Sequence, residues 1–307
     1  MASGGSIKAI VAALLANAGI ATAKFVGFAI TGSSSMLAEA VHSVADTSNQ
    51  GLLLLGTRTA RRQATSTHPF GYGRDRYFYS FVVALLLFSL GAMFALYEGT
   101  EKLRHPHELT SPLVAVVILV VAIVLEIFSF RTAIVESRKV KGDVGWWQFI
   151  RQAKTPELPV VLLEDAGALF GLVLALLGVS LTMATGDPVW DALGTIAIGV
   201  LLAVIAVVLI IEMKSLLIGE GVNPAVLTVI VDELETGKVQ RVIHIKTQYM
   251  GPDELLIAAK IALTPALSTT DIAAAIDDAE SRIRAKVPEA RLIYLEPDLD
   301  RTPAPTA

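Results

Sequence analysis

Six apolar segments, each close to the length of a bilayer-spanning helix, precede Lys214 in this chain. A helical span needs roughly 20 mostly apolar residues. The segments run from Ile7 to Ile30, Met36 to Leu55, Tyr77 to Leu96, Leu113 to Phe130, Leu158 to Met183 and Val189 to Ile211. Hydrophobic residues make up 53% of the 307 residues, and the mean hydropathy is +0.61. This composition is typical of a multispanning membrane protein rather than of a soluble chain.

The basic residues of the predicted loops indicate how the spans are oriented. The loops between segments two and three and between segments four and five carry Arg58, Arg61, Arg62, Arg74, Arg76, Arg131, Arg138, Lys139, Lys141, Arg151 and Lys154. The loops after segments one and five carry no Lys or Arg. By the positive-inside rule, both termini are expected in the cytoplasm. We expect a multi-pass protein of a bacterial inner membrane, with the first span as an uncleaved insertion signal because residues 1–6 are too short for a cleaved one.

Net charge and cysteine content exclude several classes of protein. The formal net charge of −4 offers no basic surface for nucleic acid, so the expected partners are membrane lipid and small ions. The chain has no Cys, which removes disulfides, thiolate metal sites and cysteine nucleophiles together. Any metal ion must therefore be held by nitrogen and oxygen ligands.

Two polar residues stand four apart inside the second apolar segment. His42 and Asp46 share one face of a helix, near mid-membrane, where a carboxylate costs roughly 3 kcal/mol. Asp165 brings a second acid, in the fifth segment, at a depth that lets the two acids meet. One neutral imidazole and two carboxylates suit Zn²⁺, while Mn²⁺, Co²⁺ and Fe²⁺ remain open. We predict an intramembrane site for a transported divalent cation, with no other cofactor.

The sequence leaves the fourth ligand of such a site open. Glu164 adjoins Asp165 but is rotated by about 100° around the helix, so both would bind one ion only if the helix were distorted. Glu39 lies on the same helix face as His42, where metal coordination and a solvated position near the outer mouth are equally consistent with the pattern. Water is the third choice, and it suits a site that must release its ion.

Other charged residues of the apolar segments receive simpler interpretations. Lys24, near the outer end of the first segment, is expected to extend its ammonium to the membrane interface. Glu126, near the cytoplasmic end of the fourth segment, is expected to form a salt bridge with Arg131 or another basic group, with a proton relay as the less favoured alternative. Asp191 opens the sixth segment and is interpreted as an interfacial or helix-start residue.

The composition changes beyond Lys214, and the remaining residues predict a small α+β domain. The expected elements are, in order, a helix over 223–235, strands over 239–249 and 254–263, a helix over 268–286 and a strand over 290–296. This α-β-β-α-β order suits an open-faced, ferredoxin-like sheet with helices on one side. The predicted fold class is thus a mainly α membrane protein, with a six-helix transmembrane domain over 1–213, a cytoplasmic α+β domain over 214–297 and a disordered tail over 298–307.

Two sequence motifs resemble those of the cation diffusion facilitator family, whose members are proton-coupled exporters of zinc and related divalent metals. One is the segment around His42 and Asp46, and the other is the loop His68-Pro69-Phe70-Gly71-Tyr72-Gly73-Arg74. The run Leu162-Leu163-Glu164-Asp165 is similar to the branch that contains the mitochondrial zinc transporter of animals. The resemblance implies that His42, Asp46 and Asp165 are metal ligands, and that the tail domain holds two protomers together as a homodimer.

The chain departs from the commonest family pattern in two places. In the fifth apolar segment the usual first ligand falls on Val161, which cannot bind metal, and Glu164 is the proposed substitute. In the tail domain a binuclear metal site would need several His, and His244 and Glu296 alone remain. We predict that zinc does not cross-link this tail domain as it does in some members.

The predicted function is proton-coupled efflux of a divalent cation, Zn²⁺ foremost, from the cytoplasm by alternating access. Ligands must lose their protons to bind metal, so protons are expected to replace the ion at its release. His42 is the group best suited to carry one of them. One alternative is a membrane-embedded metalloenzyme with the same ligands, although the chain has no His-Glu-x-x-His motif. The other is a metal-sensing scaffold, which would bind metal without moving it.

Overall fold

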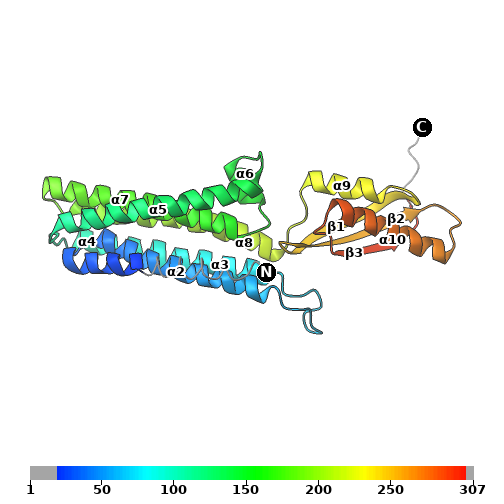
Figure 1. The fold of residues 1–307 in the computed structure, drawn as a ribbon, viewed down its shortest axis with the longest axis horizontal. Coiled ribbons are helices and arrows are strands. Elements are labelled where there is room, and N and C mark those ends of the chain that lie inside the picture. The colour runs from blue at the N-terminus through cyan, green and yellow to red at the C-terminus, as the bar shows by residue number, and fades with distance from the viewer. Residues whose placement is uncertain (1–18, 302–307) are drawn as a thin grey trace. The chain divides into compact units, whose positions relative to one another are not determined.

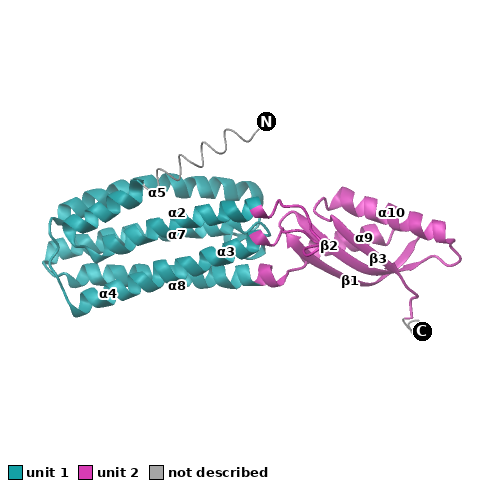
Figure 2. Cartoon of the chain, turned by 90° about the horizontal axis from the view of Figure 1, so that it is seen from below, with its two compact units in different colours: residues 1–58, 76–214 teal, residues 59–75, 215–307 magenta. Residues whose placement is uncertain are grey.

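The structure of this chain is a computed structural model that describes residues 19–301 (Figure 1). It divides into two compact units (Figure 2), the first made of residues 1–58 and 76–214 and the second of residues 59–75 and 215–307. The described helices of the first unit are Gly19–Thr31, α2 (Ser34–Thr59), α3 (Asp75–Leu86), a π-helical turn (Leu87–Met93), α4 (Phe94–Arg104), α5 (Pro112–Lys141), α6 (Trp146–Gln152), α7 (Glu157–Thr185) and α8 (Val189–Ile218). The second unit holds α9 (Pro224–Leu234), β1 (Val239–Gly251), β2 (Glu254–Leu263), α10 (Thr269–Lys286) and β3 (Leu292–Pro297).

Four helices among the described residues are long and apolar enough to cross a membrane. They are Asp75–Arg104, which is continuous from α3 through α4, and α5, α7 and α8. α5 turns large apolar side chains outward, with Leu113 66%, Val117 62% and Phe128 64% exposed. Such a wide apolar surface is unfavourable in water, and lipid is the solvent that suits it. The chain is therefore a multi-pass membrane protein.

The other two predicted spans are less apolar or less completely described. Part of the first, from Ile7 to Ile30, lies outside the described residues, and its described part is the helix Gly19–Thr31. The second is α2, a 26-residue helix whose polar side chains leave it less apolar than the other four. The number of six spans therefore stays a prediction.

The second unit is a three-stranded sheet with two helices packed on one face. β1 pairs antiparallel with β2, and β2 pairs parallel with β3, in the order β1-β2-β3. Ile230 and Leu234 of α9 and Ile283 of α10 join Ile257 and Ile261 of β2 in one apolar core. The elements follow one another along the chain as α-β-β-α-β.

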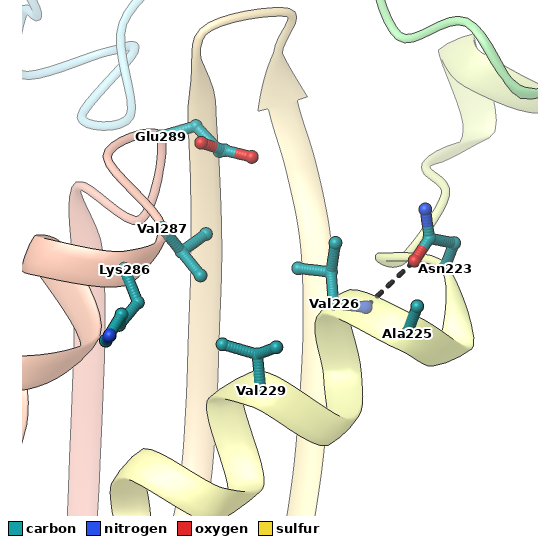
Figure 3. Close-up of a pocket in the computed structure, with 7 residues that line it drawn as sticks. All are labelled: Asn223, Ala225, Val226, Val229, Lys286, Val287 and Glu289. Carbon is teal, nitrogen blue, oxygen red and sulfur yellow. Dashed lines mark hydrogen bonds between the residues drawn. The ribbon is translucent and has the colours of Figure 1, made fainter. Parts of the chain in front are cut away.

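Both helices of the second unit begin with a side-chain cap. The Asn223 side chain accepts a hydrogen bond from the Val226 N–H at 2.9 Å (Figure 3), and Ser268 and Asp271 form a reciprocal capping box. A pocket of about 260 Å³ between the start of α9 and the end of α10 is lined by Asn223, Ala225, Val226, Val229, Lys286, Val287 and Glu289. This lining is mostly apolar and contains one amine and one carboxylate, so it offers no set of metal ligands.

The loop between α2 and α3 belongs to the second unit. A Cβ on Gly73 of this loop would lie 2.7 Å from the Met250 carbonyl oxygen, and a Cβ on Gly251 would lie 2.9 Å from Gly73 Cα. Only glycine allows two backbones to approach so closely. The loop motif that begins at His68 thus ends in a contact with the turn between β1 and β2.

Candidate metal centre

α2 places His42 and Asp46 side by side on one face. The His42 Nε2 and Asp46 Oδ2 atoms are 3.5 Å apart, and the His42 side chain is 1% exposed. Neither ring nitrogen of His42 has a hydrogen-bond partner among residues 19–301, and Asp46 Oδ1 has none in that range either. Buried polar atoms in proteins are usually paired. This face of α2 therefore has unused capacity to bind a ligand.

Asp46 and Asp165 line one small pocket among the helices of the first unit. The pocket has a volume of about 30 Å³, which is room for one or two water-sized particles. Its lining comes from the helix Gly19–Thr31, α2, α5 and α7 and consists of Ile20, Ser43, Asp46, Gln50, Glu126, Ser129 and Asp165. The structure thus brings together two acids from separate apolar segments.

α5 adds two residues to this pocket that sequence reasoning did not assign to it. Ser129 Oγ donates a hydrogen bond to Asp165 Oδ2 at 2.9 Å. Glu126 lines the same pocket and interacts electrostatically with Asp46 and Asp165. Among residues 19–301, Glu126 forms no ion pair with Arg131, because residues five apart on a helix do not share a face, whereas the basic group of Lys24 interacts with it electrostatically. The sequence pattern that could have predicted these two pocket residues is an intramembrane carboxylate, Glu126, followed three residues later by Ser129 on the same helix.

Glu164 contacts a different neighbour from Asp165. Asn49 Nδ2 of α2 donates a hydrogen bond to Glu164 Oε1 at 2.7 Å, and Glu164 is only 5% exposed. Successive helical residues are rotated by about 100°, so Asp165 reaches the pocket while Glu164 reaches α2. Asn49 received no role from the sequence, although it lies three residues after Asp46 on the same helix.

Glu39 is buried and paired with a lysine. Lys24 Nζ lies 3.0 Å from Glu39 Oε2, with the two side chains 2% and 0% exposed, and it also donates a hydrogen bond to Ser43 Oγ at 2.7 Å. The expectation that Lys24 extends to the membrane interface is therefore wrong. A buried carboxylate on α2 offers the ammonium a charged partner, and buried charges are kept where such a partner exists.

These side chains do not form a closed metal shell. No group of three or more His, Asp or Glu side chains in the described part of the chain is arranged to hold an ion. His42 lies beside Asp46, and Asp46 shares a pocket with Asp165, whereas Glu164 and Glu39 are engaged by other side chains. The assignment of these five residues as metal ligands stays a prediction.

A second buried polar cluster holds the start of α2. The carboxylate of Asp191, on α8, accepts hydrogen bonds from Ser33 Oγ at 2.8 Å, from the Ser34 N–H at 2.9 Å and from Ser35 Oγ. A carboxylate at a helix N-terminus pairs free N–H groups and complements the helix dipole. Asp191 thus caps α2 as well as opening its own helix, and it helps to fix the face on which α2 presents His42.

Comparison with known families identifies the class of protein. Residues 10–218 match the cation efflux transmembrane domain. This match covers more than half of the chain, and the chain belongs to the cation efflux family. Proteins of this family are transporters rather than enzymes.

Several relatives carry metal-transport names. The chain is 36% identical over 241 residues to the mitochondrial proton-coupled zinc antiporter SLC30A9 of Xenopus laevis, covering 78% of this chain and 43% of that protein. The human protein of the same name is 33% identical over 242 residues, with 78% and 42% covered. Metal tolerance protein C4 of Arabidopsis thaliana is 29% identical over 259 residues, with 83% and 57% covered. The chain thus spans less than half the length of these two antiporters.

Solved structures offer a more distant similarity. A nickel form of the MamM C-terminal domain is similar over 26% of this chain and 100% of that chain, with 18% sequence identity and a TM-score of 0.24.

Proposed function

We propose that this chain exports Zn²⁺ from the cytoplasm in exchange for protons, by alternating access around His42, Asp46 and Asp165. The supporting observation is that the two acids, from two helices, line one pocket beside an imidazole whose ring nitrogens have no hydrogen-bond partner among the described residues. One imidazole and two carboxylates suit Zn²⁺. Zinc is also the ion named for the antiporters similar to this chain.

The fourth ligand is proposed to be water or Glu164. Binding through Glu164 requires Asn49 to release the Glu164 carboxylate and α7 to distort, whereas a water ligand needs no rearrangement. Glu39 is the further alternative, but it is free to bind an ion only if Lys24 releases it. Mn²⁺, Co²⁺ and Fe²⁺ accept similar ligands, so the choice among ions rests on measurement.

Protons are the proposed counter-ions. Imidazole and carboxylate groups must be deprotonated to bind metal, so binding releases protons and protonation favours release of the ion. We propose His42 as a carrier, since an imidazole that releases a metal ion can accept a proton in its place. Zinc-dependent proton release from the purified protein, measured ion by ion, tests this step, and zinc binding without proton release would contradict it.

Zinc flux into sealed vesicles tests the transport function. Reconstituted protein should load Zn²⁺ when a pH gradient is imposed, and Asp46→Ala should abolish the flux while the protein stays folded. Undiminished flux through Asp46→Ala would remove this residue from the mechanism. Zinc-dependent chemistry without flux would favour a metalloenzyme, and binding without flux would favour a sensing scaffold.

We also propose six spans with both termini in the cytoplasm of a bacterial cell, a transmembrane domain over 1–213 and a cytoplasmic domain over 214–297. The chain has no Cys, so a single introduced cysteine reports its own location. Asp187→Cys should react with an impermeant thiol reagent added outside the cell, and Asp143→Cys should react only after permeabilisation. The reverse pattern would invert the orientation.

The second unit is proposed to join two copies of the chain without zinc. His244 and Glu296 line one pocket of the sheet domain, and they are its only imidazole and its only carboxylate, so the pocket lacks the several ligands of a binuclear zinc site. The mass of the protein in detergent should be that of a homodimer before and after chelation of zinc. A dimer that dissociates on chelation would show that the sheet domain does use zinc.

A further inference from the structure

A buried ion pair between Lys24 and Glu39 lies beside His42, Asp46 and Asp165. Lys24 Nζ bridges Glu39 and Ser43 of α2, at 3.0 Å from Glu39 Oε2 and 2.7 Å from Ser43 Oγ. Ser43 follows His42 in the chain and lines the same pocket as Asp46. The pair therefore lies at the edge of the candidate site, on the helix that carries two of its ligands.

The second oxygen of Glu39 is left unused. Glu39 is fully buried, and its Oε1 atom has no hydrogen-bond partner within residues 19–301. A Cβ on Gly171 of α7 would lie 2.5 Å from this oxygen. The absence of a side chain at Gly171 therefore provides the space between α2 and α7 in which the Glu39 carboxylate lies. The charge of Glu39 also acts on both His42 and Asp46. The interior thus holds a carboxylate with metal-binding capacity near the site, and Lys24 occupies one of its oxygens.

We propose that Lys24 sets the metal selectivity of the site by holding Glu39 out of the coordination shell. With Glu39 withheld, the ion meets one imidazole and the carboxylates of the pocket, a mixture that favours Zn²⁺. One more carboxylate would shift the preference toward Mn²⁺, because oxygen ligands suit Mn²⁺ and imidazole suits Zn²⁺. The ammonium also repels a divalent cation that approaches Glu39. This inference rests on the proposed transport function.

Lys24→Met tests the role of the charge, because methionine keeps the apolar body of the side chain and removes the ammonium. In reconstituted vesicles, the ratio of Mn²⁺ flux to Zn²⁺ flux should rise by about tenfold, the change that about 1.4 kcal/mol of differential binding produces. Lys139→Met removes a lysine that is 62% exposed and should leave the ratio unchanged. A folded Lys24→Met variant with the wild-type ratio would overturn the proposal.

The double variant Lys24→Met/Glu39→Gln keeps the test decisive if the single variant does not fold, since it leaves no unpaired buried carboxylate. Its ratio of Mn²⁺ flux to Zn²⁺ flux should not rise, because the carboxylate that Lys24 withholds has been removed, and calorimetry in detergent gives its Zn²⁺ affinity. A loss of Zn²⁺ affinity of about tenfold would show that Glu39 is already a ligand, and a raised Mn²⁺ ratio would show that Lys24 does not act through Glu39. Either result overturns the proposal. Failure of the proposed function is a separate outcome, in which the wild-type chain carries no Zn²⁺.

Discussion

Two buried polar clusters on α2 differ in how completely their atoms are paired. At the start of the helix, both carboxylate oxygens of Asp191 accept hydrogen bonds from Ser33, Ser34 and Ser35. Near the middle, both ring nitrogens of His42 and one oxygen each of Glu39 and Asp46 have no hydrogen-bond partner among residues 19–301. A buried polar atom without a partner costs about 1–3 kcal/mol. The first cluster thus holds the helix in place, whereas the second keeps unpaired atoms that can bind an ion and is less stabilising.

Replacing His42 should have the largest effect on Zn²⁺ flux while leaving the stability of the fold intact. His42→Leu should lower Zn²⁺ flux by more than about 100-fold, since even groups that only support metal ligands contribute about 10–100-fold. The midpoint of thermal unfolding should stay the same or rise, because leucine removes two buried nitrogens that have no hydrogen bond among residues 19–301. Flux in vesicles and unfolding in detergent, measured on the same preparation, check both. A large loss of stability would place His42 with the structural cluster and break the comparison.

Replacing Asp191 should have the opposite effect, lowering stability more than Zn²⁺ binding. Asp191→Ala should lower the free energy of unfolding by about 3 kcal/mol, because several buried donors lose a charged acceptor together. Asp191→Asn should have a smaller effect, since its amide oxygen still accepts. Thermal unfolding and Zn²⁺ affinity of the folded fraction are the measurements. Unchanged stability combined with weaker Zn²⁺ binding would mean that Asp191 belongs to the metal site instead.

Gly171 tests whether packing positions the unused oxygen of Glu39. Gly171→Ala would bring a methyl group to 2.5 Å from Glu39 Oε1, and such overpacking costs about 1–3 kcal/mol. Gly51→Ala on α2 is the matched control, because nothing lies within 4 Å of its Cβ and alanine favours a helix by up to about 1 kcal/mol. Chemical unfolding should therefore shift in opposite directions for the two variants. Equal shifts would show that the space beside Gly171 is not confined.

The smallest effect is expected from an exposed polar cluster in the sheet domain. A hydrogen bond from Lys238, with a second from Ser268, lowers the pKa of Asp271 from 3.8 to about 2. Because the folded-state pKa is the lower one, the contribution of Asp271 to stability is present above about pH 4 and is lost as the pH falls through about 2. Asp271→Asn should speed hydrogen exchange in α10 at pH 5, and the difference from the wild type should shrink toward pH 2. Asp277→Asn, on the same helix, is the control. An equal change in hydrogen exchange in both variants would show that the cap formed by Asp271 does not stabilise α10.

The sequence alone indicated the helices and the pairing of His42 with Asp46, because both depend on local periodicity. Apolar side chains recur over lengths that suit a bilayer, and residues four apart on a helix share a face whatever surrounds it. The helix starts near residues 223 and 268 were predicted in the same way, since the caps found there bond to backbone only a few residues away. The same reasoning placed Asp165 at a similar depth to Asp46, although it could not say which helices would be neighbours.

The tertiary structure alone decided the partners of the buried charges. Lys24 and Glu39 are 15 positions apart, Glu164 and Asn49 are 115, and Asp191 and Ser33 are 158. A charge in an apolar segment must find a counter-group, but the sequence does not say whether that group is a nearby residue, the membrane interface or a side chain on another helix. Helix packing makes that choice, which is why Lys24 pairs with Glu39 and Asp191 caps α2. The sequence determines which ligand types the site contains. Helix packing determines which of those groups are free to bind an ion.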